Sequence, residues 1–316
     1  MEVHPLVSII SVNFNELEAT MEMLVSLEQS EYPNFEVILV DNGSRQNPGE
    51  PVQSRFPNTR FIRSDENLGF AGGNNLGIDI AKGEFLFFIN NDTEIVPGLI
   101  FELVAQFKKI DDLGAISPLI YYHPSVANGR NNLVQFAGAT EIHSITGRNQ
   151  TLGLGELDNG QFRIPESTPY AHGAAMMISR EVLEKVGPMP TNFFLYYEEL
   201  DWCEQIKNAG YKIYIDPLAK IYHKESLAVG RDSPMKTYFL NRNRLLFIRR
   251  NRSKIQLIGF WLFLIFIVIP KNVLLFSIKG KWSHVKAFLN GIFWNVSNDK
   301  NKTSEHGWAI PKPVNS

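Results

Sequence analysis

The sequence predicts an α/β fold in which a mostly parallel sheet carries helices on both faces, followed by a basic and apolar helical segment. In the first hundred residues, short apolar runs alternate with segments of helical periodicity, at a spacing that suits βαβ units. Strand candidates such as Glu84–Ile89 are apolar on both faces, which indicates helices on both sides of the sheet. From residue 233 the composition becomes basic and apolar, which sets off the helical segment.

The first half of the fold is expected over about residues 1–113. Strands are predicted at Val7–Val12, Phe35–Val40, Arg60–Arg63 and Glu84–Ile89, and helices at Glu16–Glu28 and Ala71–Lys82. Leu17, Met21, Leu24 and Leu27 give the first helix its period, and Gly83 marks the end of the second. This alternation is typical of a doubly wound nucleotide-binding unit.

The second half, about residues 114–232, has a less regular pattern. Short strands are predicted at Gly114–Tyr122, Ala174–Ser179 and Ala219–Tyr222, and residues 147–160 are rich in turn formers. A helix is expected over Glu199–Ala209, because apolar residues recur every three positions and Gly210 supplies a stop.

Composition excludes several classes of protein. The chain has 316 residues, of which 44% are hydrophobic, with 33 acidic and 31 basic side chains, so disordered and collagen-like proteins are excluded. The single cysteine, Cys203, cannot form an internal disulfide, and no signal-peptide pattern precedes the first apolar run. A cytoplasmic protein is therefore the default expectation.

The charge distribution is uneven. Residues 233–298 hold eleven Lys or Arg residues and no Asp or Glu, so a basic tail follows an acidic body. Its partner is expected to be anionic, and nucleic acid or a membrane surface are the two candidates. The aliphatic block Ile255–Ile269 argues against nucleic acid, because binders of that kind interleave charge with exposed aromatic side chains.

The basic tail is expected to associate with the membrane. A basic helix over Met235–Arg252 precedes the apolar run Ile255–Ile269, which Pro270 is expected to close. Fifteen residues fall short of the about 20 that a spanning helix needs, so the segment is predicted to lie in, or dip into, the inner leaflet. The alternative is a buried core helix of a soluble domain. We thus expect a main domain over 1–232, a membrane-associating region over 233–298 and a polar tail over 299–316.

Polar residues follow the predicted strands at their carboxyl ends, where ligands bind in open parallel sheets. They are Asn13 and Asn15 after the first strand, Asp41 after the second, and Asn90, Asn91 and Asp92 after the fourth. Such side chains can bind a base or ribose, and a carboxylate such as Asp92 can hold a hard divalent cation against a diphosphate. The alternative is that each is an ordinary turn residue.

Residues 67–75 form a glycine-containing segment before the second predicted helix. It includes Asn67, Gly69 and Asn75, and it resembles a phosphate-binding loop only loosely. Neither the dinucleotide fingerprint nor the P-loop pattern is matched, which disfavours NAD and ATP as ligands.

Three carboxylates follow an aromatic run within residues 192–202. Glu198, Glu199 and Asp201 would repel one another, and the aromatic residues before them would exclude water. Both effects raise the pKa of a carboxyl group, which suits a general base. The alternative is that acidic residues simply stabilise the first turn of a helix. His223 ends a predicted strand and is a candidate metal ligand.

With these residues in place, the chain resembles the inverting glycosyltransferases of family 2, of the bacterial rhamnosyltransferase-like type. The matching blocks are Val7–Asn15, Val37–Ser44, Asn67–Gly77, Phe85–Ile95, Gly173–Ser179 and Phe193–Trp202, in order and spacing. The resemblance covers about residues 5–250 and implies a GT-A fold, with a Rossmann-like sheet. It also implies an enzyme of cell-envelope polysaccharide biosynthesis that transfers a hexosyl or deoxyhexosyl group.

The resemblance further implies roles for individual residues. Asp41 would lie near the base of a UDP-, dTDP- or GDP-sugar, and Asn67–Asn75 near its ribose and diphosphate. Asp92 would bind Mg²⁺ or Mn²⁺, with His223 completing the protein ligands. Glu199 would be the catalytic base, with Glu198 and Asp201 as close competitors.

The acceptor implied is a saccharide or a polyprenyl-linked sugar, which a peripheral enzyme would meet at the inner face of the cytoplasmic membrane. Two other functions stay open from sequence. One is a non-catalytic protein that binds nucleotide sugars or scaffolds a polysaccharide assembly system. The other is a nucleotidyltransferase, which is disfavoured because the expected glycine-rich basic loop after the first strand is missing.

Overall fold

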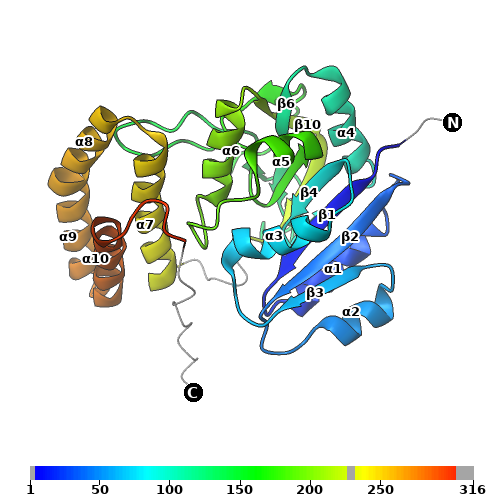
Figure 1. Ribbon diagram of the computed structural model, residues 1–316, viewed down its shortest axis with the longest axis horizontal. Helices are drawn as coiled ribbons and strands as arrows, with labels where there is room; N and C mark the ends of the chain where they lie inside the picture. The colour runs from blue at the N-terminus through cyan, green and yellow to red at the C-terminus, as the bar shows by residue number, and fades with distance from the viewer. Residues whose placement is uncertain (1–3, 226–231, 304–316) are drawn as a thin grey trace.

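The structure is a computed structural model that describes residues 4–225 and 232–303, and within these residues a ten-stranded sheet forms the centre of the fold (Figure 1). The strands are β1 (Val7–Asn13), β2 (Phe35–Asn42), β3 (Arg60–Ser64), β4 (Phe85–Ile89), β5 (Thr93–Ile95), β6 (Leu113–Tyr122), β7 (Val134–Phe136), β8 (Glu166–Ser167), β9 (Ala175–Ser179) and β10 (Lys212–His223). Their order is β3-β2-β1-β4-β9-β6-β10-β5, with β7 beside β6 and β8 beside β10.

Most of the long strands point in one direction. Strands β3, β2, β1 and β4 pair in parallel, and so do β6 and β10. Strand β9 lies antiparallel between β4 and β6, so the two parallel groups share one direction. The carboxyl ends of β1, β2, β4 and β10 therefore meet at one edge, together with the first residue of β9. The predicted mostly parallel sheet is confirmed.

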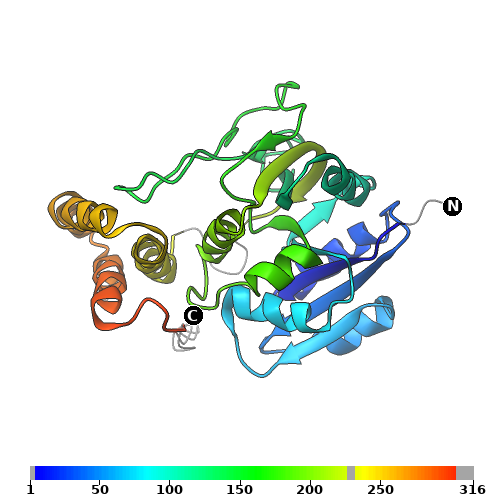
Figure 2. The ribbon, with the colours of Figure 1, turned by 45° about the horizontal axis from the view of Figure 1, so that its top comes forward.

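Helices cover both faces of this sheet, as predicted (Figures 1 and 2). On one face lie α1 (Leu17–Leu27), α2 (Gly49–Arg55) and α4 (Leu99–Lys109), and on the other lie α3 (Gly69–Ile80), α5 (Arg180–Val186) and α6 (Glu198–Asn208). In the second group, both polar atoms of the Asn75 side chain on α3 hydrogen-bond the backbone of Met189, which lies between α5 and α6.

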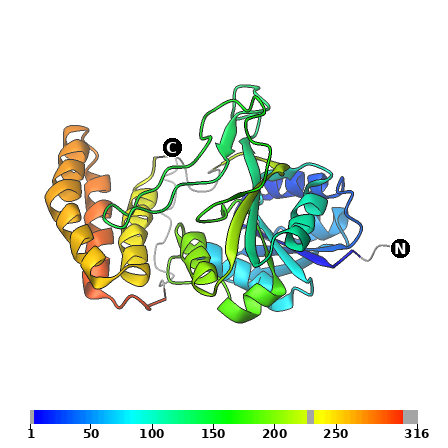
Figure 3. The ribbon, with the colours of Figure 1, turned by 90° about the horizontal axis from the view of Figure 1, so that it is seen from above.

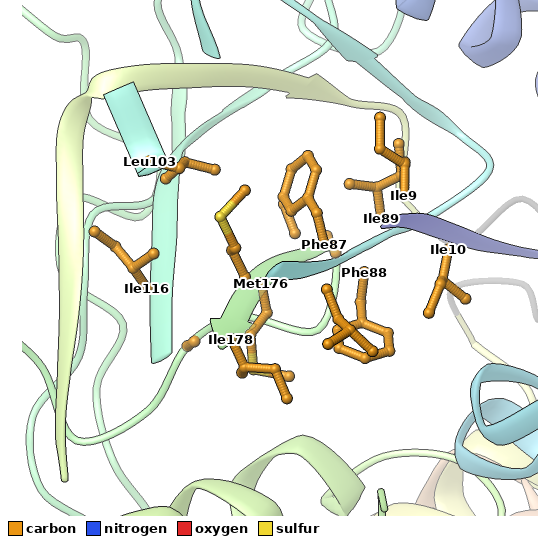
Figure 4. Close-up of a cluster of buried hydrophobic side chains, with 14 of the residues drawn as sticks. Ile9, Ile10, Phe87, Phe88, Ile89, Leu103, Ile116, Met176 and Ile178 are labelled. Atoms are coloured by element: carbon orange, nitrogen blue, oxygen red, sulfur yellow. The ribbon is translucent and has the colours of Figure 1, made fainter. Parts of the chain in front are cut away.

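The core of the sheet is built around β4, whose five residues are all apolar and all buried. Phe87 and Phe88 project from opposite faces of this strand between Ile9 of β1 and Met176 of β9 (Figure 4). A strand that is apolar on both faces must be covered on both faces. This explains why the continuous apolar pattern of residues 85–89 correctly predicted a central strand.

The carboxyl-terminal helices form a second packed unit beside α6 (Figures 1 and 3). They are α7 (Pro234–Asn251), α8 (Lys254–Phe263), α9 (Ile269–Ile278) and α10 (Trp282–Ser297), with a short π-helix at Leu264–Val268 between α8 and α9. Phe247, Phe260 and Phe288 are buried in their shared core, together with Phe193 from the segment before α6. The irregular segment around Gly147 reaches across to contact α7 and α8. Residues before and after position 232, where the sequence predicted a boundary between two regions, are therefore packed together.

The sequence predicted that the apolar helix ends at Pro270, and this prediction is wrong. The helix continues through it, from Lys254 to Ile278, and its 25 residues are long and apolar enough to cross a membrane. The π-turn before Pro270 widens the helix where the proline ring would otherwise collide with a carbonyl of the preceding turn. Only 17% of its most apolar window is buried, so most of that window lies outside the shared core into which Phe260, Leu264 and Val268 pack.

Candidate active site

A cavity of about 630 Å³ opens at the edge of the sheet where the parallel strands end. That volume is in the range of sites for small organic ligands. Its walls come from the residues after β1, β2, β4 and β10, from the first turns of α3, α6 and α7, and from residues 172–174 before β9. Segments far apart in the sequence meet here.

Most of the predicted site residues line this one cavity. They are Asn15, Asn67, Gly69, Asn90, Asn91, Asp92, Glu198, Glu199 and His223. The carboxylates of Asp92 and Glu199, which lie more than a hundred positions apart in the chain, therefore open onto the same space.

Asn13 and Asp41 lie behind the cavity wall. Both are buried, and Nδ2 of Asn13 donates a 2.8 Å hydrogen bond to Oδ1 of Asp41. The second carboxylate oxygen of Asp41 lies 3.5 Å from Nε of Arg63. These contacts tie the ends of β1, β2 and β3 together, so the two residues support the wall instead of lining it.

Asn75 and Asp201 also lie outside the lining, which corrects two expectations. Both polar atoms of Asn75 bind the backbone of Met189, so the side chain is committed to packing. Asp201 is fully buried, and its two oxygens accept 2.9 Å hydrogen bonds from Nε and Nη2 of Arg250. A fully buried carboxylate whose two oxygens are bound to a guanidinium lacks the access to an acceptor hydroxyl that a general base needs.

The segment 67–75 is mostly helix, because the helix predicted over Ala71–Lys82 begins two residues earlier than expected. Helix α3 begins at Gly69, and the side chain of Asn42 binds Leu68 and Gly69 through their backbones. Gly69 has a φ of +75°, and a Cβ there would lie 2.3 Å from the carbonyl oxygen of Phe194. Only glycine allows this close approach, which joins the start of α3 to the segment before α6.

Asp92 and His223 form the polar centre of the cavity. Oδ1 of Asp92 lies 3.1 Å from Nε2 of His223, and Nδ1 of the same ring lies 2.8 Å from Oε1 of Gln135. If Nδ1 donates its proton to Gln135, the lone pair of Nε2 faces a carboxylate oxygen. Nδ2 of Asn90 lies 3.3 Å from the same Nε2 and can donate to it, and a metal ion bound to both Nε2 and Oδ1 could replace that contact.

The donor set of Asp92 and His223 suits a divalent cation that is held only partly by the protein. Within residues 4–225 and 232–303 no group of three His, Cys, Asp or Glu side chains is arranged to hold a metal ion. One carboxylate oxygen and one imidazole nitrogen leave several coordination positions for ligand oxygens, such as those of a diphosphate. The two residues therefore fit a cation that binds together with its ligand.

Glu198 and Glu199 open the first turn of α6 toward the cavity. Burial raises the pKa of Glu199 to about 7. Burial, and then the charge of Glu199, raise the pKa of Glu198 well above its usual value, and Oε2 of Glu198 is buried without a hydrogen-bond partner. Of the two carboxyl groups, Glu198 is the one whose surroundings favour the protonated form, while Glu199, with a pKa of about 7, is partly ionised at neutral pH. The sequence predicted that exclusion of water would raise the pKa of these carboxyl groups, and burial raises both pKa values.

Gln135 and His172 also line the cavity and were not predicted from the sequence. Burial, and then the nearby His223, lower the pKa of His172 to about 3, so this ring is neutral. Gln135 lies between two buried apolar residues of β7. A single polar residue inside a short apolar run could have indicated Gln135 from the sequence. His172 follows no periodic pattern, so the sequence offered no such indication for it.

A model of one protein family matches more than half of the chain. The description "Glycosyl transferase family 2" applies to residues 8–187. The chain belongs to this family and is a glycosyltransferase, as the motifs in the sequence indicated.

Two curated relatives of the chain are named as glycosyltransferases. The chain is 22% identical over 272 residues to the N-acetylglucosaminyl-diphospho-decaprenol L-rhamnosyltransferase of Mycobacterium tuberculosis, covering 80% of this chain and 85% of that protein. It is 28% identical to the low-salt glycan biosynthesis hexosyltransferase Agl10 of Haloferax volcanii, covering 67% of this chain and 66% of that protein. Other relatives are much longer, since the match covers only 19% of the O-antigen biosynthesis protein RfbC of Myxococcus xanthus and 26% of the uncharacterized protein y4gI of Sinorhizobium fredii, at 27% and 29% identity.

Solved structures share the GT-A fold. The mannosyltransferase PcManGT from Pyrobaculum calidifontis, in complex with GDP-Man and Mn²⁺, aligns with a TM-score of 0.56 at 16% identity, over 94% of this chain and 76% of its own. GalNAc-T7 with UDP, GalNAc and Mn²⁺ aligns with a TM-score of 0.61 at 18% identity, over 78% of this chain and 48% of its own. At this identity the likeness concerns the fold alone.

Proposed function

We propose that the chain is an inverting glycosyltransferase that moves a hexosyl or deoxyhexosyl group from a UDP-, dTDP- or GDP-sugar to an acceptor hydroxyl. One observation carries this proposal. Asp92, His223 and Glu199 line one cavity of nucleotide-sugar size at the carboxyl edge of the sheet. The cavity thus offers a partial cation site and a carboxylate of raised pKa in the same space.

The donor is held by the wall that the parallel strands form. Asn15, Asn67 and Gly69 face the nucleotide, while Asn13 and Asp41 fix the strand ends behind them. Asn90 and Asn91 lie beside Asp92 and contact the diphosphate. Asp92 and His223 would hold Mg²⁺ or Mn²⁺, and that cation would stabilise the negative charge of the departing nucleoside diphosphate.

Glu199 is the general base in this proposal. Its carboxylate accepts the proton of the acceptor hydroxyl while that oxygen attacks the anomeric carbon from the face opposite the diphosphate. A single displacement inverts the anomeric configuration and needs no covalent sugar–enzyme intermediate. A pKa of about 7 keeps a large fraction of Glu199 ionised at neutral pH and still allows it to hold the proton afterwards.

The proposed acceptor is a saccharide or a polyprenyl-linked sugar at the inner face of the cytoplasmic membrane. The 25-residue helix exposes large apolar side chains, including Ile255, Phe266 and Ile278, and basic residues flank it. Arg250, Arg252 and Lys281 pair with acidic residues, and Lys254, Lys271 and Lys279 lie on or next to the exposed apolar helix. Apolar surface beside these lysines favours an anionic lipid surface. The proposed location is therefore the cytoplasm, in contact with that membrane.

The membrane contact can be tested with a charged double variant. Ile258→Asp with Phe266→Asp places two carboxylates on side chains that are 60% and 69% exposed. Losing the burial of two large apolar side chains costs about 3 kcal/mol, so binding to phosphatidylglycerol vesicles should weaken about 100-fold in a sedimentation assay. Val25→Asp, at an exposed apolar position on α1, should bind like the wild type. Equal binding of the double variant and the wild type would remove the helix from the membrane contact.

The donor can be identified by thermal unfolding with a panel of nucleotide sugars and Mn²⁺. UDP-GalNAc, GDP-mannose and dTDP-rhamnose represent the three nucleotide classes. A donor at about 100 times its Kd stabilises the fold by about 2.7 kcal/mol, which corresponds to a rise in Tm of roughly 5 °C. Slow release of nucleoside diphosphate from the same donor would separate an enzyme from a binding protein. If a broad panel leaves both Tm and donor unchanged, the proposed function is wrong.

A further inference from the structure

The segment before α6 has an unusual backbone. Phe194, Tyr196 and Tyr197 have φ values of 69°, 69° and 77°, in the left-handed region that side-chain-bearing residues rarely adopt. This conformation costs free energy at each position and persists only when surrounding contacts enforce it. The segment leads directly into Glu198 and Glu199, so its conformation determines where these carboxylates point.

Helix α7 supplies the contacts that hold this segment. Nδ2 of Asn243 lies 3.0, 2.7 and 2.9 Å from the carbonyl oxygens of Phe193, Leu195 and Tyr196. Asn243 is fully buried. A single amide group thus gathers three carbonyls of the strained segment at one point.

Arg242 adds a second set of bonds. Its guanidinium donates 3.0 Å hydrogen bonds to the carbonyls of Asn192 and Phe193, and a 2.8 Å bond to Oδ1 of Asn243. The guanidinium stacks on the ring of Trp294 at 3.8 Å, and the side chain is 1% exposed. Because Arg242 orients the amide of Asn243, its planar donor group fixes the whole arrangement.

Helix α7 also binds the first turn of α6, after the two glutamates. Arg250 and Asn251 both bind the carboxylate of Asp201, two positions after Glu199. The start of α6 is therefore attached to α7 both before and after the two glutamates. The buried Asp201 therefore anchors α6 to α7, which is a structural role in place of the catalytic one expected from sequence.

We propose that Arg242 and Asn243 are positioning residues that hold the carbonyls of residues 192–196, so that Glu199 faces the cavity. This inference rests on the proposed function of Glu199. It assigns part of the active-site architecture to α7, beyond residues 8–187 that match the family model. Neither side chain lines the cavity, so both act through the backbone of another segment.

The test compares two chemically identical substitutions in the full-length protein. Asn243→Asp keeps the size of the side chain but replaces the donor by a carboxylate that repels the three carbonyls, while its bond from Arg242 remains. Asn295→Asp on α10 is the matched control. Asn295 is also buried, and its amide donates to the backbone of Arg242 and Gly291, away from the strained segment. Arg242→Lys is a milder second variant, which keeps the charge and loses the fork of donors.

The first measurement is hydrogen exchange of residues 192–201, which needs no ligand. Asn243→Asp should raise the exchange rate of this segment at least 10-fold, with Arg242→Lys raising it less and Asn295→Asp leaving it unchanged. Turnover is then measured with the panel donor that wild type converts fastest. Asn243→Asp should lower kcat about 30-fold and change the KM of the donor less than threefold, because the donor wall is untouched.

The pH profile separates positioning from loss of fold. The titratable groups around Glu199 are Glu198 and Cys203 on α6, Tyr197 before it and Tyr170 before β9. Burial keeps Tyr170, Tyr197 and Cys203 protonated below pH 9. Asp92 and His223 of the same cavity are unchanged in every variant, so a difference in the acidic limb between variants reports the two glutamates. In Asn243→Asp its midpoint should lie at least half a unit below that of Asn295→Asp, which carries the same added charge, since a displaced Glu199 is more hydrated. A smaller folded fraction would lower the rate without moving this midpoint.

The outcomes are distinguishable from failure of the proposed function. Normal exchange, kcat and pH midpoint in Asn243→Asp, or changes no larger than those of Asn295→Asp, would overturn the inference. If Asn243→Asp does not fold, Arg242→Lys decides in the same way. Glu199→Gln is measured in parallel, and normal turnover there would refute the proposed base whatever Asn243→Asp shows.

Discussion

Glu199→Gln is expected to lower kcat about 1,000-fold, since a positioned general base contributes roughly 100- to 10,000-fold and glutamine cannot accept the proton. The substitution keeps the size of the side chain and removes a buried charge, so the free energy of unfolding should not fall. Donor binding should stay within threefold of wild type. The measurement is steady-state turnover together with Tm, with the donor identified by thermal unfolding.

The neighbouring Glu198 provides the comparison for this variant. Burial and the charge of Glu199 raise its pKa well above the usual value, so of the two carboxyl groups it is the one that the pair favours in the protonated form. Glu198→Gln should therefore lower kcat less than 10-fold. A reversed order, with Glu198→Gln the more damaging change, would transfer the role of base to Glu198.

The same assignment fixes the sign of the pH dependence. The base acts in its deprotonated form, so the rate should rise with pH and level off above the pKa of Glu199, which is about 7. At pH 5 the rate should be roughly 100-fold below the plateau, provided that the chemical step limits turnover. A rate that is constant between pH 5 and pH 8 would contradict a base with this pKa.

Asp92→Ala is expected to have the second-largest effect. Removing one of two protein ligands for the cation should lower kcat about 100- to 1,000-fold, because cation stabilisation of the leaving group is worth several kcal/mol. A readout independent of turnover is Mn²⁺ binding in the presence of UDP or GDP, followed by electron paramagnetic resonance, which should weaken at least 10-fold. Asp79→Ala, an exposed carboxylate on α3, is the matched control and should change neither quantity. Unchanged Mn²⁺ binding in Asp92→Ala would place the cation elsewhere.

The sequence predicted the amino-terminal half of the fold well, because its strands are buried on both faces. Residues 85–89 had to be a central strand, and their neighbours followed from βαβ spacing. Helices α2 and α4 were missed. Strand β10 was predicted over only four of its residues, because Asp216 and Pro217 interrupt the apolar pattern at the place where the strand bulges. Pro270 predicted the end of a helix that in fact continues to Ile278, because a π-turn before the proline accommodates its ring.

The candidate site was predictable by position but not by orientation. Strand ends located Asn13, Asn15, Asp41 and Asp92 at the correct edge, yet Asn13 and Asp41 bond to each other behind the wall. Whether a side chain faces a ligand or a neighbour depends on partners such as Arg63, from another strand. In the same way, Asp201 pairs with Arg250, 49 positions further along the chain, and no local sequence pattern predicts this contact.

Crystals grown with the identified donor and Mn²⁺ test the central claim most directly. Anomalous scattering locates the ion, and density for the donor locates its anomeric carbon. The proposed chemistry predicts Mn²⁺ within coordination distance of Asp92 and His223, at about 2.0–2.3 Å, with the anomeric carbon facing Glu199 across the cavity. Mn²⁺ bound away from both residues, or a sugar directed away from Glu199, would contradict it.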